Sequence, residues 1–467
     1  MTERTAVGIW AEYPSGARWT NEGMSRLVGF LIEGAARSGR VVFRLVVPPW
    51  LREEALADLR GLSATEGSDF TVHSPSDTRS EPDEAAAWAE REHATPLERH
   101  DATMRDLVAF ANAHVLVEGW VSMFPHFVHA LDLRRPKAVI LPDAIPVMFP
   151  EADPSRWGDD GPHWIWRSRV SKVMSRSDRV ITFSRHVARE QAEALFGVDS
   201  ERTVAIPHAP PDLSGLLPYV PGRRATAESR RRAGEVLRAH ARERGWRYLQ
   251  DFAFEDAAYV VVSTQDRVTK NIGRAAEAVR RLVRRDRVGV KLFTTAPLHF
   301  GADWTLLPGL IEREQLHRDV VSLPDLPRRV HAALFHCAAS TVHPSFFEGG
   351  LGPFPFYESV SVGTPCAMAR GPHVAELLAE EPGLAADTFD PYDVDGLAAL
   401  LRGLVLGGRE EALARQSAIY ERLLRRRDWG RVAEEYANAA LGGRFGAPLA
   451  AVRAARAVSL PADRVAG

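Results

Sequence analysis

The chain has 467 residues, of which 45% are apolar and 26% charged, and its formal net charge at neutral pH is −2. This length exceeds one ordinary hydrophobic core and indicates two domains, and the composition is that of a globular protein. The balanced charge argues against a global nucleic-acid binder, and no apolar run approaches the roughly 18 residues that a membrane-spanning helix needs.

The first half of the chain alternates short apolar runs with longer amphipathic stretches, which is typical of parallel α/β architecture. It opens with charges and a short apolar run instead of a signal-peptide core, so we expect a cytoplasmic protein. Residues 23–39 are predicted to form a helix, because apolar residues recur at helical spacing and Gly39 follows as a stop. The expected strands are 6–10, 41–47, 113–119, 137–142, 179–184 and 203–207. Residues 61–103 are polar and acidic and are predicted to form a surface excursion.

The second half repeats this alternation. The expected strands are 259–265, 288–295, 319–324 and 340–345, with helices at 272–285 and 326–338. Doubly wound sheets of this kind bind ligands beyond the carboxyl ends of their strands. No G-x-G-x-x-G follows the first strand, and no G-x-x-x-x-G-K-[ST] occurs, which argues against a dinucleotide-binding dehydrogenase and a P-loop enzyme.

Three further features concern the connection, the end of the chain and the thiols. Residues 221–250 contain nine arginines. They form either a solvated helix beside an interdomain linker, the favoured interpretation, or a contact for an anionic acceptor or a membrane surface. Residues 449–467 resemble a loosely held tail. Cys337 and Cys366 lie in apolar surroundings and are predicted to be buried free thiols, not a disulfide.

Two cations follow the strand 259–265 at its carboxyl end. Arg267 and Lys270 stand in the turn "QDRVTKN", where a doubly wound sheet binds its ligand. Together they could neutralise a diphosphate, the guanidinium as a fork and the ammonium as a point charge. Such a pair alone is a weak signal, because cations on a surface turn usually face solvent.

The segment 343–365, "HPSFFEGGLGPFPFYESVSVGTP", strengthens that signal. A buried strand leads into a glycine-rich loop, and a small-residue helix follows. Glycines let backbone N–H groups approach an anion closely. The backbone candidates are Gly349, Gly350, Leu351 and Gly352. Glu348 before the loop could face a sugar, and Glu358 near the helix start could accept two hydroxyl hydrogen bonds from a ribose.

This segment resembles the signature of retaining GT-B glycosyltransferases of family 4. The matching positions are Pro344, Ser345, Glu348, Gly349, Gly352, Glu358, Gly363, Thr364 and Pro365. The resemblance runs from about residue 105 to 440 and is strongest in the second half. It implies two Rossmann-like, doubly wound domains that face each other across a cleft. The implied divisions are an acceptor-side domain 1–215, an Arg-rich connection 216–254, a nucleotide-sugar-binding domain 255–428, and a crossing helix with a tail 429–467.

The resemblance also implies an activity. A hexose would move from a UDP- or GDP-sugar to an unidentified glycan, lipid-linked or natural-product acceptor, with retention at the anomeric carbon. Arg267 and Lys270 would stabilise the departing diphosphate, Glu348 would hold the sugar hydroxyls, and Glu358 the ribose. The resemblance implies no cofactor, and the nucleoside-diphosphate sugar is a substrate. Two side-chain cations make a divalent metal unnecessary.

The first domain contributes weaker candidates. Glu22 and Gly23 stand where the family places a glycine-rich loop beneath the diphosphate, although an ordinary helix start fits them equally well. Asp143 remains from the family's His-Asp pair. His126, three residues before His129 on an expected helix, is a candidate for the acceptor side, and both fit core or acceptor-side histidines better than metal ligands.

The chain departs from the family pattern at three places. Glu348 and Glu358 are ten residues apart instead of eight, Arg267 and Lys270 three apart instead of five, and Pro142 replaces the histidine of the His-Asp pair. The longer loop is predicted to reshape the donor pocket without destroying it. Two alternatives stay open: another GT-B enzyme, such as an epimerase or a phosphorylase, and a catalytically impaired protein that binds nucleotide-sugar or a partner.

Overall fold

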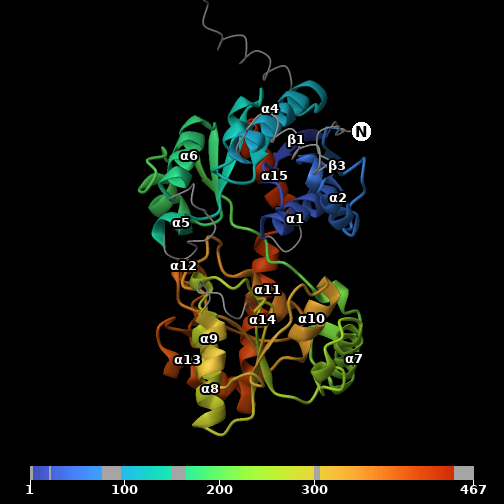
Figure 1. Cartoon of the computed structure of the whole chain (residues 1–467), viewed down its shortest axis with the longest axis vertical. Helices are drawn as coiled ribbons and strands as arrows, with labels where there is room; N and C mark the ends of the chain where they lie inside the picture. Colours follow the sequence, from blue (N-terminus) through green and yellow to red (C-terminus); the bar gives the residue numbers. More distant parts are fainter. Residues whose placement is uncertain (1–3, 20–22, 76–95, 150–162, 299–305, 446–467) are drawn as a thin grey trace, which may run out of the picture.

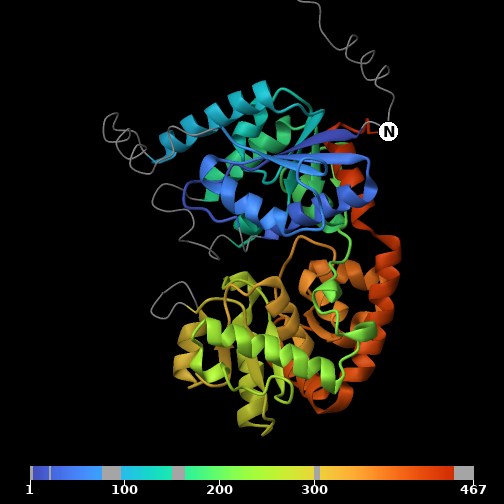
Figure 2. The same cartoon turned by 90° about the vertical axis from the view of Figure 1, so that its right-hand side faces the viewer.

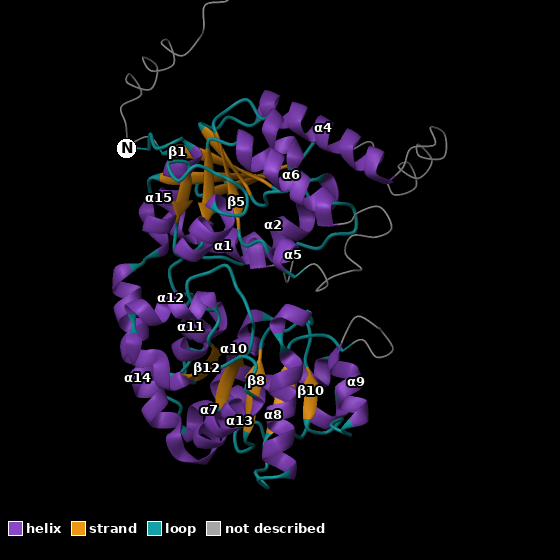
Figure 3. Cartoon of the chain, turned by 90° about the vertical axis from the view of Figure 1, so that its left-hand side faces the viewer, coloured by secondary structure: helices purple, strands orange, loops and turns teal. Residues whose placement is uncertain are grey.

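The computed structural model describes residues 4–19, 23–75, 96–149, 163–298 and 306–445. These residues form two α/β domains that lie one above the other along the longest axis (Figure 1). Each domain is built on one parallel sheet flanked by helices (Figure 3). The proposed tail at 449–467 and the candidate Glu22 lie outside the described residues.

The first domain contains a seven-stranded parallel sheet in the order β3-β2-β1-β4-β5-β6-β7. Its strands are β1 (Thr5–Trp10), β2 (Val41–Val46), β3 (Phe70–His73), β4 (Gly119–Ser122), β5 (Lys137–Leu141), β6 (Arg179–Thr182) and β7 (Thr203–Ala205). Five of the six expected strands are confirmed. Strand β3 lies inside the segment 61–103, which the sequence predicted to be only a surface excursion.

The strand predicted at 113–119 was wrong in position. A helix runs to His114, and β4 begins only at Gly119. The register is set by Trp120, whose ring packs on β1 where Gly8 has no side chain; a Cβ on Gly8 would lie 2.2 Å from that ring. Packing across the sheet therefore overrode the local apolar alternation that suggested an earlier strand.

The second domain contains a six-stranded parallel sheet in the order β10-β9-β8-β11-β12-β13. Its strands are β8 (Tyr259–Val262), β9 (Lys291–Thr294), β10 (Val320–Ser322), β11 (Ser340–His343), β12 (Cys366–Ala369) and β13 (Thr388–Phe389). The four expected strands are confirmed, and β12 and β13 were not predicted. Both sheets share the doubly wound order that creates a ligand site at the carboxyl ends of the strands.

Helices cover both sheets. In the first domain they are α1 (Gly23–Ser38), α2 (Arg52–Arg60), α4 (Pro96–His114), α5 (Ile145–Met148) and α6 (His163–Arg176). In the second they are α7 (Ala227–Glu243), α8 (Ile272–Arg284), α9 (Leu306–Arg313), α10 (Arg328–Cys337), α11 (Phe354–Ser361), α12 (Pro372–Glu380), α13 (Val394–Gly403) and α14 (Arg409–Arg426). The helices expected at 23–39, 272–285 and 326–338 are confirmed. No helix among these described residues is long and apolar enough to cross a bilayer.

A final helix, α15 (Trp429–Ala440), returns to the first domain and packs on α1. Figure 2 shows the last helices, in orange-red and red, running along one side of both domains. The rings of Phe30 and Trp429 stack with centroids 4.7 Å apart, and the buried His208 ring lies 2.9 Å from the Tyr436 hydroxyl. Helix α15 therefore joins the two domains, in addition to the chain segment that leads from β7 to α7.

Replacing Gly34 by alanine should destabilise the contact between α1 and α15. A Cβ at this position would lie 2.1 Å from the Trp429 carbonyl oxygen, and two backbones cannot both give way. We expect a loss of about 1–3 kcal/mol in the free energy of unfolding, measured from the melting curve, despite the better helix propensity of alanine. Gly309→Ala in α9 is the control, because nothing lies within 4 Å of its Cβ position and a gain of about 0.5–1 kcal/mol is expected. A Gly34→Ala variant that melts at or above the wild-type temperature would show that the helices are not in this contact.

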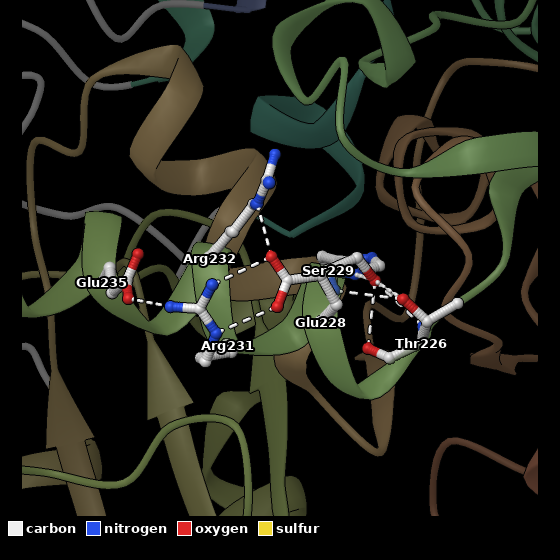
Figure 4. Close-up of polar contacts among 7 residues, drawn as sticks. Thr226, Glu228, Ser229, Arg231, Arg232 and Glu235 are labelled. Carbon is white, nitrogen blue, oxygen red and sulfur yellow. Dashed lines mark hydrogen bonds and ion pairs between the residues drawn. The ribbon is translucent and has the colours of Figure 1, made fainter.

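Helix α7 occupies the middle of the Arg-rich segment, and four of the nine arginines there, Arg223, Arg231, Arg232 and Arg238, form ion pairs. Thr226 caps α7 in a reciprocal capping box with Ser229. Figure 4 shows Glu228 held between Arg231 and Arg232. Arg238 forms a further ion pair at 2.6 Å with Glu255 beyond the helix, and Arg231 also contacts Glu235. These pairs favour the interpretation as a solvated helix over a contact for an anionic acceptor or membrane.

Both cysteines are buried and free, as predicted. Burial raises the pKa of Cys337 and that of Cys366 to about 12, so neither thiol is ionised at neutral pH. Both are therefore small apolar core residues without the thiolate that nucleophilic or metal-binding cysteines require.

Candidate functional site

The turn after β8 is fastened to the end of β11. Asn271 adopts a left-handed conformation with φ 55°, and its side-chain amide donates to the carbonyl oxygens of Pro344 and Pro391, both at 3.0 Å. This fixes the short helical turn Val268–Lys270 beside the glycine-rich loop. Lys270 is thereby directed at the loop and not at solvent, and its side chain is only 16% exposed.

Lys270 pairs with Glu348 at this junction. The Lys270 Nζ lies 2.5 Å from Glu348 Oε1, and the glutamate side chain is 24% exposed. Burial by itself would raise the pKa of Glu348, but the Lys270 ammonium and the neighbouring His343 and His373 outweigh it and lower that pKa to about 2. Glu348 is therefore ionised at every physiological pH.

The first domain reaches the same place through the residues after β5. A Cβ on Gly349 would lie 1.6 Å from the Pro142 carbonyl oxygen, and the Ser184 hydroxyl donates to the Gly349 carbonyl at 2.8 Å. Burial raises the pKa of Asp143, with the nearby Glu348 adding to that effect, whereas the Ile145 amide and the Lys270 ammonium act against it. The strand ends of both sheets thus meet at the Lys270–Glu348 pair.

Arg267 belongs to this junction as well. It is half-buried at the start of the turn, and its positive charge reaches Asp143 and works against the raised pKa of that carboxyl. Two cations, from the turn after β8, and two carboxyl groups, from opposite domains, are therefore gathered in one place. This arrangement can bind an anion with hydroxyl groups attached to it.

The glycine-rich loop is shaped by its neighbours. Gly352 has φ +75°, and a Cβ there would lie 2.5 Å from the Tyr357 hydroxyl, which itself donates to the Leu351 carbonyl at 2.7 Å. The Gly352 amide donates to the His373 carbonyl at 3.0 Å. That amide is already used within the protein, so Gly349, Gly350 and Leu351 remain as backbone donors for an anion.

The loop is two residues longer than the family pattern, and the additional length lies at the start of α11. Pro353 caps this helix and Pro355 lies in its first turn, where a missing N–H costs no hydrogen bond. Phe354, between them, packs edge-on against Phe30 of the first domain at 5.8 Å. The lengthening thus anchors the loop to the opposite domain.

The other predicted residues lie elsewhere. Glu358 is 1% exposed and forms an ion pair with Arg26 of α1, so its carboxylate already has a partner from the first domain. Gly23 is exposed at the first position of α1. His126 was expected on a helix with His129, but it lies in a turn before the short helix Val128–Asp132, because the chain turns at "FPHF". Its ring contacts the aromatic rings of Phe124, Phe127 and Trp166.

Sequence reasoning missed three features of this region. Arg26 gave no signal, because it lies 332 residues from Glu358. His343 stands directly before the Pro-Ser of the signature and could have been noticed there. His373, at the start of α12, carries no motif. Within the described ranges, no group of three or more His, Cys, Asp and Glu side chains is arranged to hold a metal ion.

Lowering the pH from 7 to 5 should destabilise the fold. Burial lowers the pKa of His336 and His343 to about 4, and of His208 and His373 to about 3. Below about pH 6.5 the unfolded chain binds protons at these residues and the folded chain does not, so each costs up to about 2 kcal/mol at pH 5. Glu348 has the opposite effect, because its pKa is lower in the folded chain than in the unfolded chain. The stability that its ionised form contributes is lost only below about pH 4.3.

Melting temperatures at pH 7, 6 and 5 test this expectation. The His208→Gln variant is the comparison, because glutamine can still bond to the Tyr436 hydroxyl but gains no proton. The drop in melting temperature should be smaller in that variant. Equal melting temperatures at pH 7 and pH 5 in the wild type would contradict the burial of neutral histidines.

The two parallel α/β sheets, with their strand ends directed at one another, define a GT-B fold. No protein-family model matches the chain, and no curated protein matches it in sequence. Solved structures do match it at low identity and over almost the whole chain, which confirms the predicted fold.

Three of these structures illustrate the likeness. HepE from Anabaena, in complex with UDP-glucose, superposes with a TM-score of 0.61 at 14% identity, covering 93% of this chain and 99% of HepE. Sucrose-phosphate synthase from Thermosynechococcus elongatus gives 0.61 at 13% identity over 98% and 100% of the two chains. The alpha,alpha-trehalose 6-phosphate synthase from Burkholderia multivorans gives 0.57 at 14% identity over 99% of both.

Proposed function

We propose that the chain is a retaining glycosyltransferase of the family 4 type, which moves a hexose from a UDP- or GDP-sugar to an acceptor. The observation that carries this proposal is the convergence of Lys270, Arg267, Glu348 and Asp143 where the strand ends of both sheets meet. The UDP-glucose in the structurally similar HepE supports a donor of this class.

The roles follow from charge. As the bond between the anomeric carbon and the diphosphate oxygen breaks, negative charge grows on the diphosphate, and Lys270 and Arg267 stabilise it. The backbone amides of the loop 349–351 add their dipoles. Glu348 accepts hydrogen bonds from the sugar hydroxyls. The acceptor oxygen bonds to the same face of the sugar and gives its proton to the departing diphosphate.

The remaining candidates take places around this centre. The proposed domain 255–428 holds the donor, and the domain 1–215 holds the acceptor, beside Asp143 and His126. Gly23, the first residue of α1, would lie beneath the diphosphate, as the family resemblance implies. Glu358 would bind the ribose, which requires Arg26 to turn away from it.

The pair formed by Arg26 and Glu358 also favours a second candidate, a catalytically impaired protein that binds nucleotide-sugar without transferring it. A ribose ligand that is almost fully buried and already paired would leave the donor incompletely held. Pro142 points the same way, because its ring offers no hydrogen-bond donor to a sugar.

A panel of UDP- and GDP-hexoses tests both candidates. Thermal shift reports binding, and release of nucleoside diphosphate without acceptor reports turnover. The proposed enzyme should bind one donor and hydrolyse it slowly. Binding without release would support the impaired protein, and neither binding nor release with any donor would overturn both.

A further inference from the structure

Two buried histidines stand beside the Lys270–Glu348 pair without a role in the function proposed above. His343 ends β11 and His373 opens α12, with 4% and 1% of their surfaces exposed. Their rings meet edge to face, with centroids 5.4 Å apart. Among the described residues, His343 Nε2 and both ring nitrogens of His373 have no hydrogen-bond partner. Buried polar atoms without partners are uncommon and call for an explanation.

The geometry of Glu348 supplies one. Its Oε1 lies 2.5 Å from Lys270 Nζ and 3.6 Å from His343 Nε2. The second distance is too long for a hydrogen bond. Lys270 therefore binds the Glu348 carboxylate, and the His343 imidazole lies next to it without bonding to it. If Lys270 turns to a diphosphate, Glu348 keeps a buried charge and needs another donor.

We propose that His343 replaces Lys270 as the partner of Glu348 when a nucleoside-diphosphate sugar binds, and that it takes up a proton from solvent in doing so. This inference rests on the proposed function, which assigns the diphosphate to Lys270. The Nε2–H of His343 then donates to Glu348 Oε1, and no bond of the donor forms or breaks in this step. His343 is thus a positioning residue, which keeps the carboxylate ionised and in place for the sugar hydroxyls.

The charges around His343 support this exchange. Glu348, Lys270 and His373 face its ring, with His186 beyond His373, and Asp143 faces the ion pair from the first domain. Burial lowers the pKa of His343 to about 4, and Lys270 opposes its protonation further. A bound diphosphate would engage the lysine charge and bring negative charge beside Glu348, both of which raise that pKa. The donor should therefore bind more tightly as the pH falls.

Titration calorimetry in buffers of different ionisation enthalpy measures the proton directly. The probe is whichever UDP- or GDP-hexose binds, because a diphosphate diester has no group that titrates near neutrality. We expect the wild type to take up a proton fraction that grows between about pH 7 and about pH 5.5, with an affinity gain of up to about tenfold per pH unit.

Two variants test whether His343 is the residue that takes up the proton. In His343→Gln, the amide can still donate to Glu348 but gains no proton, so the uptake should vanish. His240→Gln is the matched control, because His240 Nδ1 lies 3.5 Å from Glu243 Oε2 on α7 and His240 is not among the charged groups that act on His343 or Glu348, so the uptake should persist. If His343→Gln does not fold, Glu348→Gln serves instead, since it removes the charge that stabilises the imidazolium and should also abolish uptake.

The outcomes separate this inference from the proposed function. Donor binding without proton uptake in the wild type, or undiminished uptake in His343→Gln, would overturn the role of His343 alone. Failure of every nucleotide-sugar to bind would overturn the proposed function and this inference with it.

Discussion

Replacing Lys270 by alanine is expected to lower the rate of donor turnover by about 10²–10³-fold, the usual cost of removing one preorganised group that stabilises transition-state charge. The effect should fall on kcat, because the charge on the diphosphate grows as the bond breaks. It should also exceed what a surface lysine contributes, since Lys270 is only 16% exposed and works in a poorly solvated junction.

The measurement is release of nucleoside diphosphate at saturating donor, with the fold checked by circular dichroism. Lys291→Ala is the matched control, because Lys291 begins β9 at the opposite end of the sheet and bonds the Arg318 carbonyl there. Its turnover should equal that of the wild type. Near wild-type turnover of the Lys270→Ala variant would show that Lys270 does not stabilise the departing diphosphate.

A methyl group on Gly349 should be nearly as damaging. The Cβ would lie 1.6 Å from the Pro142 carbonyl oxygen, and both atoms are anchored to backbone, so no side-chain rotation relieves the clash. The loop must shift, and Glu348 shifts with it relative to Lys270. A displacement of about 1 Å in such a site costs on the order of 10²-fold in kcat/KM.

Gly289→Ala provides the control for Gly349→Ala. Nothing lies within 4 Å of its Cβ position, and it lies before β9, outside the glycine-rich loop. We expect kcat/KM within a few-fold of wild type for Gly289→Ala and a far lower value for Gly349→Ala, with both variants folded. Equal activity of the two variants would mean that the first domain does not touch the loop during turnover.

The fold was largely predictable, because both sheets are built from apolar runs separated by amphipathic helices. The predictions that were wrong or missing concern single strands. Strand β4 is placed by the packing of Trp120 on Gly8, a contact between residues more than a hundred positions apart. Strand β12 reads Cys-Ala-Met-Ala, without the β-branched or aromatic residues typical of strands, and β13 has only two residues.

The candidate site was predictable where its residues lie at strand ends, since topology brings such ends together. Lys270 and Glu348 were named from the sequence and form an ion pair. The partner of Glu358 was not predictable, because Arg26 comes from a helix of the other domain. Contacts across the junction depend on how two domains dock, and that information is spread over both surfaces.

The return of α15 has a consequence for synthesis on the ribosome. The second domain is made from one continuous stretch and can close as soon as it emerges. The first domain emerges earlier but receives α15, with Trp429 and Tyr436, only after the whole second domain has been translated. Until then, Phe30 lacks the stacked ring of Trp429, and His208 lacks the Tyr436 hydroxyl. The half made first is therefore completed last, and its nascent form should depend on chaperones for longer.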